Sequence, residues 1–377
     1  MPDMPVNSQA SHQSADALRI QGEATAGTAI TYLSAIRWLT SLSVLGILSV
    51  LVGVGCLMIG AESLGVTAVL QSLGMALKEG QADVESVGVS GVILLQVRLP
   101  RVVLAFLVGS SLAAVGVALQ ALLRNPLADP YVLGISSGAA FGATLGILLG
   151  IGGTVMGLSV LPLWAFVGGL LSILVVYRIS ITYRMLSVHT LLLAGVILNA
   201  LFSALIMFTV SIADPSRAFK MMMWLMGTLG SPEYSTLAWL VMFLSVGGLW
   251  LFWAARPLNI LTMGEETARA LGVEIERVKK LIFVIAALMT GAVVSIAGLI
   301  GFVGMVVPHT VRMIVGADHR LLLPASALVG GIFLMIADTL ARTVLAPTEL
   351  PVGVVTALVG GPVFIYLLVK RRAGVAL

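Results

Sequence analysis

Long apolar runs, separated by short polar stretches, fill most of the chain. The runs at 40–59, 161–177 and 281–297 approach the ~20 residues that a helix needs to cross ~30 Å of hydrocarbon. They lack the two-residue alternation that marks the strands of a membrane barrel. Because a helix satisfies its backbone hydrogen-bonding groups within itself, the pattern predicts an all-α, polytopic membrane protein.

Hydropathy predicts about ten membrane spans in this chain. They run roughly 36–60, 99–122, 131–150, 159–180, 188–212, 235–254, 279–298, 299–316, 321–343 and 352–369. Gly298, Gly301 and Gly304 permit the tight turn that must join the seventh span to the eighth. Two polar segments remain. Residues 1–33 are predicted to be a disordered cytoplasmic tail, and 61–97 a surface loop with a short helix.

Composition and charge support this interpretation. Apolar residues make up 59% of the chain and charged residues 10%, against roughly a quarter charged in soluble domains. With the N-terminus inside, about fifteen of the 21 Lys and Arg residues fall on the cytoplasmic side. The positive-inside rule therefore predicts a multi-pass protein of the cell (inner) membrane with both termini cytoplasmic. This topology explains the net charge of +4 without any nucleic-acid partner.

The third predicted span carries a glycine every fourth residue, at positions 134, 138, 142, 146 and 150. This spacing gives one helix face that a neighbouring helix can approach backbone to backbone. Close packing alone explains the pattern. A smooth wall beside a pathway for a bulky solute is the functional alternative, and the two are compatible.

The longest hydrophilic loop on the predicted inside is 256–278, and residues 264–272 within it read as a short amphipathic helix. Glu265 and Glu266 complement the dipole at its start, and Gly272 is a plausible stop. A compact protrusion of this kind at the membrane surface is a possible binding site for another protein. The simpler alternative is that it is an ordinary surface loop.

Three arginines break the charge rule on the outer side: Arg98, Arg101 and Arg342. They could contact lipid headgroups by extending along the surface, or form a basic docking surface for an acidic partner, because arginine pairs with carboxylates through two hydrogen bonds. Asp338 is the clearest charge within a span. It should face protein and find a partner, for which Arg342, four residues on, is the candidate.

The loop at 125–130 contains two prolines, which predicts irregular backbone at the cytoplasmic face, as found at gates. Sites for chemistry are not apparent. The sequence has no G-x-x-x-x-G-K-[ST] phosphate loop, no G-x-S-x-G elbow and no H-E-x-x-H pair. The histidines are too scattered to predict a metal site. We therefore expect no enzyme and no cofactor bound by this chain.

Four stretches together resemble one family, the FecCD or BtuC type of permease subunit in ABC importers for vitamin B12, iron–siderophores and haem. They are residues 98–101 (RLPR); residues 119–130 (LQALLRNPLADP) with 133–138 (LGISSG); residues 298–309 (GLIGFVGMVVPH) with 318–324 (DHRLLLP); and residues 349–357 (ELPVGVVTA) with 361–364 (GPVF). The resemblance covers about residues 98–372.

The resemblance implies a BtuC-like bundle of ten helices per subunit, so 34–372 would form one transmembrane permease domain. It implies a second copy of the chain, two ABC ATPase subunits that use ATP and Mg, a periplasmic or lipid-anchored substrate-binding protein, and a metal-chelate cargo. By the same resemblance, specific residues take roles in docking, coupling, gating and lining the pathway. Docking falls to Arg98, Arg101 and Arg342; ATPase coupling to Gly264, Glu265, Glu266, Ala268, Arg269, Leu271 and Gly272; the cytoplasmic gate to Asn125, Leu127, Val188 and His189; and pathway lining to Asn199 and Ser203.

At Val188 and His189 this sequence departs from the small hydroxyl residues of the B12 permease, which puts that half of the gate in doubt. Two other function classes stay open. An ion-coupled secondary transporter of a small solute would need more carboxylates within the membrane than Asp338 alone. A polytopic membrane enzyme would need a catalytic constellation, and none is visible.

Overall fold

The structure, a computed structural model, describes residues 35–60, 65, 69, 74, 91–151, 153–155, 158–182 and 185–372. The expected tail at 1–33 and most of the expected loop at 61–97 lie outside these ranges. The chain divides into two units at Thr40, and the second, Ser41–Leu377, contains every described element apart from the first residues of α2.

Within the described ranges, ten apolar helices account for the predicted spans, so the all-α membrane fold is confirmed. Seven are long enough to cross a membrane and three are shorter. The long ones are α2 (Ala35–Met58), η1 with α5 (Ile93–Arg98 and Leu99–Leu122), α7 (Val160–Ser180), α8 (Val188–Ile212), α10 (Tyr234–Trp253), α13 (Ile275–Ala297) and α15 (His319–Thr343). The shorter apolar stretches are α6 (Ile135–Leu148), α14 (Val303–Val315) and the Val352–Leu367 part of α16 (Val352–Arg372).

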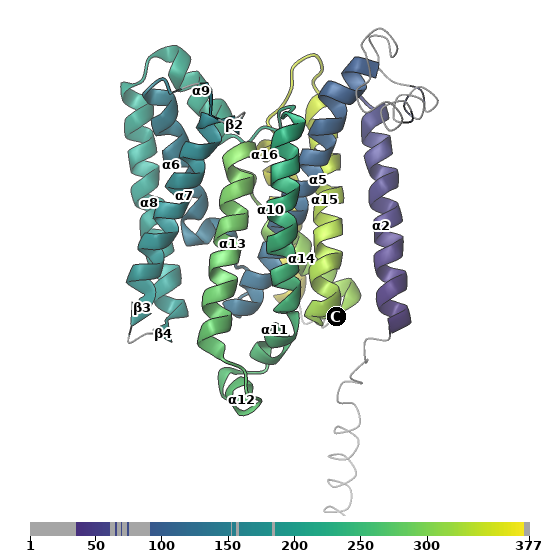
Figure 1. Ribbon diagram of the computed structural model, residues 1–377, viewed down its shortest axis with the longest axis vertical. Helices are drawn as coiled ribbons and strands as arrows, with labels where there is room; N and C mark the ends of the chain where they lie inside the picture. The colour runs from purple at the N-terminus through teal and green to yellow at the C-terminus, as the bar shows by residue number, and fades with distance from the viewer. Residues whose placement is uncertain are drawn as a thin grey trace, which may run out of the picture. The chain divides into compact units, whose positions relative to one another are not determined.

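Short elements join these helices. They are the 3₁₀ turn η2 (Pro130–Leu133), α9 (Pro215–Leu225), α11 (Ala255–Thr262) and α12 (Glu265–Ala270). Two antiparallel pairs of two-residue strands complete the set, β1 (Thr154–Val155) with β2 (Leu158–Ser159) and β3 (Ile181–Thr182) with β4 (Met185–Leu186). Figure 1 shows α11, α12 and the β3–β4 pair at one end of the bundle, and α9 and β2 at the other. We call these the α12 end and the α9 end.

Helix α5 forms the centre of the bundle. It packs most extensively on α15 and also contacts α10, α13 and α14. Glycines allow the closest approaches: the backbones of Gly109 and Gly330 touch where α5 crosses α15, and Gly116 faces the Gly304 carbonyl where α5 crosses α14. A side chain at these points would collide with the neighbouring backbone, so the core depends on backbone-to-backbone packing.

The glycine face of the third span is covered by protein. Gly138 and Gly142 of α6 lie against Gly168 and Trp164 of α7. The packing interpretation is therefore confirmed, and the alternative that this face borders a pathway is wrong for Gly138 and Gly142. Gly134 has a left-handed backbone with φ of 79° and ends η2, which is why α6 begins at Ile135 rather than at the predicted residue 131.

The break between the seventh and eighth spans is partly as expected. Gly298 has φ of 69° and ends α13, but Gly304 lies inside α14, where it packs on α5. The described start of the second span also differs from the prediction. Residues 93–97 belong to the predicted surface loop 61–97, yet with Arg98 they form a π-helical turn continuous with α5.

Candidate functional site

The knob predicted at residues 264–272 is the helix α12, which extends beyond the ends of α11 and α13 (Figure 1). Gly264 and Gly272 have φ of 125° and 78°, so glycine is suited to both of its ends. Below it lies a small apolar core of Leu261, Ala268 and Ile275. This core packs α12 against the end of α11 and the start of α13.

The outer surface of α12 combines charge with an exposed apolar side chain. Glu266, Arg269 and Gly272 are exposed, and Leu271 is 61% exposed. Ala268, one of the residues to which the resemblance assigns a coupling role, is fully buried in the local core with Leu261. An exposed leucine on a protrusion would gain about 1.5–3 kcal/mol if a partner protein buried its side chain fully.

Glu265 anchors α12 to the bundle. Its carboxylate lies 2.9 Å from Nζ of Lys279, a lysine that α13 buries. The hydrogen bond from Lys279 holds the pKa of Glu265 below its usual range, and the charge of Arg124 lowers it further. Arg124 belongs to the loop that follows α5, so this loop lies within electrostatic reach of α12.

The side chains of Asn125 and Asp129 stabilise the loop at 123–129 by accepting hydrogen bonds from backbone N–H groups. The Asn125 side chain accepts a hydrogen bond from the backbone N–H of Leu127 at 2.9 Å, and Leu127 itself is exposed. Asp129 caps η2 by accepting from the N–H of Tyr131 at 2.8 Å. Burial raises the pKa of Asp129 to about 6, and the Tyr131 hydrogen bond opposes the rise.

The other predicted gate residues, Val188 and His189, open α8 directly after its N-cap Ser187, and His189 is exposed. Of the two residues expected to line a pathway, Ser203 is exposed, whereas Asn199 contacts η2 and α6. Asn199 donates to the Tyr131 carbonyl at 2.9 Å and lies 2.6 Å from the Ser137 hydroxyl. Asn199 thus ties α8 to the end of the 123–133 segment.

At the α9 end, Asp338 is the centre of a buried ion-pair cluster. It is 1% exposed and lies 3.0 Å from Nη2 of Arg101 and 3.1 Å from Nε of Arg342. The predicted pairing with Arg342 is confirmed. Sequence reasoning missed Arg101, which also contacts Glu349 at 2.8 Å, because these partners lie far apart along the chain.

The three arginines expected to form an exposed docking surface lie within the protein. Arg98 and Arg101 are buried, and the side chain of Arg342 is 8% exposed. Arg98 donates to the Leu57 carbonyl at 2.9 Å, so it holds the end of α2. The exposed member of the cluster is the carboxylate of Glu349, which lies within one of the four family-like stretches.

Asn259 of α11 makes a second junction that sequence reasoning missed. Its amide donates to Asp318 at 2.8 Å, and its oxygen accepts from the N–H of His319, also at 2.8 Å, so it joins α11 to the start of α15. Burial raises the pKa of Asp318, but hydrogen bonds from Arg320 and Asn259 outweigh it and lower the pKa to about 2. The sequence around Asn259 gives no sign that its side chain contacts Asp318, the N-cap of α15, because the two residues lie far apart along the chain.

Among the residues that the structure describes, no group of three or more His, Cys, Asp and Glu side chains is arranged to hold a metal ion. The features that stand out are mechanical: a protrusion at one end, a buried charge cluster at the other, and a glycine-packed core between them.

Comparison with known proteins agrees with this architecture. The model of the FecCD transport family matches residues 45–370. The cobalamin import system permease protein BtuC of Halobacterium salinarum is 46% identical over 282 residues, covering 74% of this chain and 74% of the relative. The hemin transport system permease protein HmuU of Yersinia pestis is 43% identical over 291 residues, covering 74% and 84% respectively.

A solved structure assigned to the metal-chelate type of ABC transporter, in an inward-facing conformation, has the same fold. It superposes with a TM-score of 0.74 at 32% identity, covering 88% of this chain and 99% of the other. The family match spans nearly all of the described bundle, and the two relatives named above each align with about three quarters of the chain. The chain therefore belongs to the FecCD transport family.

Proposed function

We propose that the chain is the permease subunit of an ABC importer that moves a metal chelate across the cell membrane. Two copies would form the pathway, two separate ATPase subunits would bind at the α12 end, and a substrate-binding protein would dock at the α9 end. The observation that carries the proposal is the protrusion formed by α12. This chain, a member of the FecCD transport family, presents a helix that packs on a small local core and has an exposed leucine at its end.

The mechanism follows from differential affinity for two conformations. ATP binding closes the ATPase pair, and the α12 helices carry that movement into the bundle. The loop at 125–130 and the start of α8, with Val188 and His189, then change the opening at the α12 end. The largely apolar outer surface of α8, including Leu193, Ile197 and Phe208, would hold the cargo weakly and release it. The chain does no covalent chemistry and binds no cofactor itself.

The coupling role is tested by Leu271→Asp in proteoliposomes that contain the whole importer. Burying an aspartate at the centre of an interface costs about 2 kcal/mol or more, so we expect uptake to fall about thirtyfold. Leu271→Met keeps an apolar side chain at the same position and should transport normally. Normal uptake by the aspartate variant would remove the role of α12.

The docking proposal rests on charge. Arg98, Arg101 and Arg342 outnumber the carboxylates of Asp338 and Glu349 by one, so this group of five described residues carries a net positive charge even though the arginines are buried. Glu349→Gln removes the exposed negative charge and should raise the association rate of an acidic binding protein, most clearly at low salt. An association rate that is unchanged at every salt concentration would argue against docking at this end.

The same proteoliposomes test the main alternative. Uptake that continues when the ATPase is inactivated would favour an ion-coupled transporter, whereas the ABC proposal expects it to stop. The cargo is proposed as a class: iron–siderophore, haem or cobalamin. The two relatives named above are described for cobalamin and for hemin, and the chelate retained by the cognate binding protein would identify the cargo here.

A further inference from the structure

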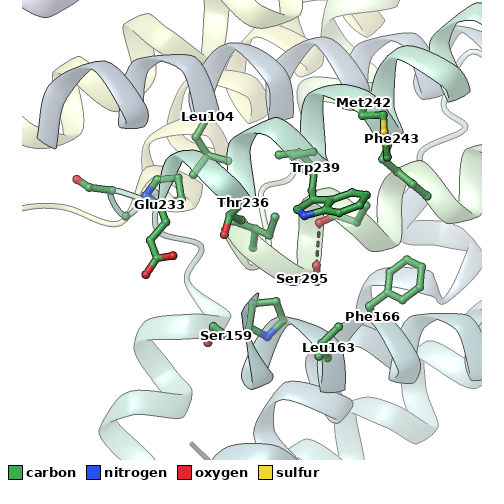
Figure 2. Close-up of a pocket in the computed structure, with 17 residues that line it drawn as sticks. Leu104, Ser159, Leu163, Phe166, Glu233, Thr236, Trp239, Met242, Phe243 and Ser295 are labelled. Atoms are coloured by element: carbon green, nitrogen blue, oxygen red, sulfur yellow. Dashed lines mark hydrogen bonds between the residues drawn. The ribbon is translucent and has the colours of Figure 1, made fainter. Parts of the chain in front are cut away.

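A groove of about 590 Å³ lies between α7, α10 and α13 at the α9 end of the bundle (Figure 2). Helices α7 and α10 each pack on α13, which forms the floor with Ala292, Ser295 and Ile296. The small side chains of Ala292 and Ser295 leave the floor open. The volume falls within the range of about 300–1,000 Å³ typical of small-molecule sites.

The walls of the groove reach the outer surface of the bundle. Leu163 of α7 and Trp239 and Met242 of α10 line it and are exposed, with Trp239 at 59%. All three helices that form the groove are candidate membrane spans. If these helices span the membrane, the groove runs from their ends at Ser159 and Glu233 along segments that lipid would surround, where hydrocarbon chains are the abundant apolar molecules.

Polarity changes along the groove in one direction. Glu233 lies at one end in Figure 2, whereas Phe166 and Phe243 lie at the other. The two phenylalanine rings pack edge to face with centroids 6.5 Å apart and narrow that end. An amphiphile with a polar head beside Glu233 and an apolar tail along Trp239 matches this order.

The negative charge of Glu233 at the polar end of the groove favours some lipid headgroups over others. Glu233 is exposed and accepts a hydrogen bond from the Ser235 hydroxyl at 3.3 Å. Within the described ranges no lysine or arginine forms an ion pair with it. A primary ammonium can both neutralise and hydrogen-bond this carboxylate. A quaternary ammonium has no N–H group to donate, and an anionic headgroup would be repelled.

We propose that this groove binds one phosphatidylethanolamine molecule from the leaflet at the α9 end, with an acyl chain along α13 and the ammonium at Glu233. The site is separate from the proposed coupling and gating residues, so it stands or falls independently of the transport proposal. Its occupant would fill the space between α7 and α10 and so support their packing on α13.

Quenching of tryptophan fluorescence by brominated lipids tests the site in the intact chain. The signal of Trp239 is the difference between the wild type and Trp239→Phe. Trp253, at the opposite end of α10 and 73% exposed, is the matched control because it is outside the groove. The bilayers are phosphatidylcholine with an increasing mole fraction of brominated phosphatidylethanolamine. The mole fraction that gives half-maximal quenching should be about threefold lower for Trp239 than for Trp253, the factor expected from one exposed ion pair.

Two variants separate the parts of the proposal. Ala292→Phe should fill the floor and make Trp239 respond like Trp253, whereas Leu249→Phe on the exposed face of α10 should change nothing. Glu233→Gln alters no volume and should abolish the preference for phosphatidylethanolamine over brominated phosphatidylcholine. Equal responses of Trp239 and Trp253 in the wild type would overturn the proposal. So would a Trp239 that no brominated lipid quenches, which would indicate that protein covers the groove.

Discussion

Replacing Asp338 with asparagine tests how much the buried charge cluster contributes to the fold. The substitution keeps the shape of the side chain and removes its charge. Arg101 would retain Glu349 at 2.8 Å, but among the residues that the structure describes Arg342 would keep only neutral acceptors, the Thr339 hydroxyl at 3.3 Å and the Cys56 carbonyl at 3.5 Å. The loss therefore falls mainly on Arg342, whose side chain is only 8% exposed.

Breaking a buried ion pair from one side costs about 3–5 kcal/mol, because the other charge remains buried without compensation. Two unit charges about 4 Å apart give about 4 kcal/mol at an effective dielectric constant of about 20, which agrees. We expect a loss of that size in the free energy of unfolding of Asp338→Asn. The measurement is a titration with sodium dodecyl sulfate in mixed micelles, followed by tryptophan fluorescence.

Glu274→Gln provides the matched control, because Glu274 pairs with Arg277 at 2.7 Å on an exposed surface. An exposed pair of this kind contributes about 0–1 kcal/mol. The double variant Asp338→Asn with Arg342→Met removes both partners and should recover at least about 1 kcal/mol relative to additivity. Equal losses for Asp338→Asn and Glu274→Gln, or strict additivity in the double variant, would refute the reasoning.

Two further predictions concern the α12 end. The raised pKa of Asp129 means that the folded state favours the protonated acid, so its stabilisation is present below the ordinary pKa and is lost as pH rises through about 6. The asparagine of Asp129→Asn can still accept a hydrogen bond from the Tyr131 N–H. The substitution should therefore raise the free energy of unfolding by up to about 3 kcal/mol at pH 8 and by little at pH 4. Equal effects at both pH values would contradict this reasoning. Asn259→Ala leaves the buried N–H of His319 without its acceptor, at a cost of about 1–3 kcal/mol. It should also lower the amount of chelate transported per ATP hydrolysed, and an unchanged ratio in proteoliposomes would show that the α11–α15 junction does not transmit movement.

The spans were predictable because hydropathy is a property of each segment alone. Every predicted span corresponds to a helix, and most ends agree within a few residues. The exceptions have local causes. Gly134 and the Asp129 cap delay α6, and α9 was missed because an eleven-residue amphipathic helix gives no long apolar window. Its Asp214-Pro215 start, a capping residue followed by proline at the first helical position, could have revealed it.

The sites were predictable only in part. The knob at 264–272 carries its own signal in the glycines and the acidic first turn, and the structure contains it. The pairing of Asp338 with Arg101 has no such signal, because it depends on how α5 crosses α15. Burial of Arg98 and Arg101 could not be read from the sequence for the same reason. The roles in docking, coupling and gating remain predictions.

Movement of α12 has a short physical route to the proposed gate. The local core of Leu261, Ala268 and Ile275 makes α12 move together with α11 and the start of α13. Helix α11 packs on α5 and α15, and Asn259 fastens it to the N-terminus of α15. The charge of Arg124 lowers the pKa of Glu265, so the 123–129 loop lies within electrostatic reach of the same point. Helix α15 continues from its junction with α11 to Asp338 at the other end of the bundle, so the proposed coupling helix and the buried charge cluster are joined by one rigid element.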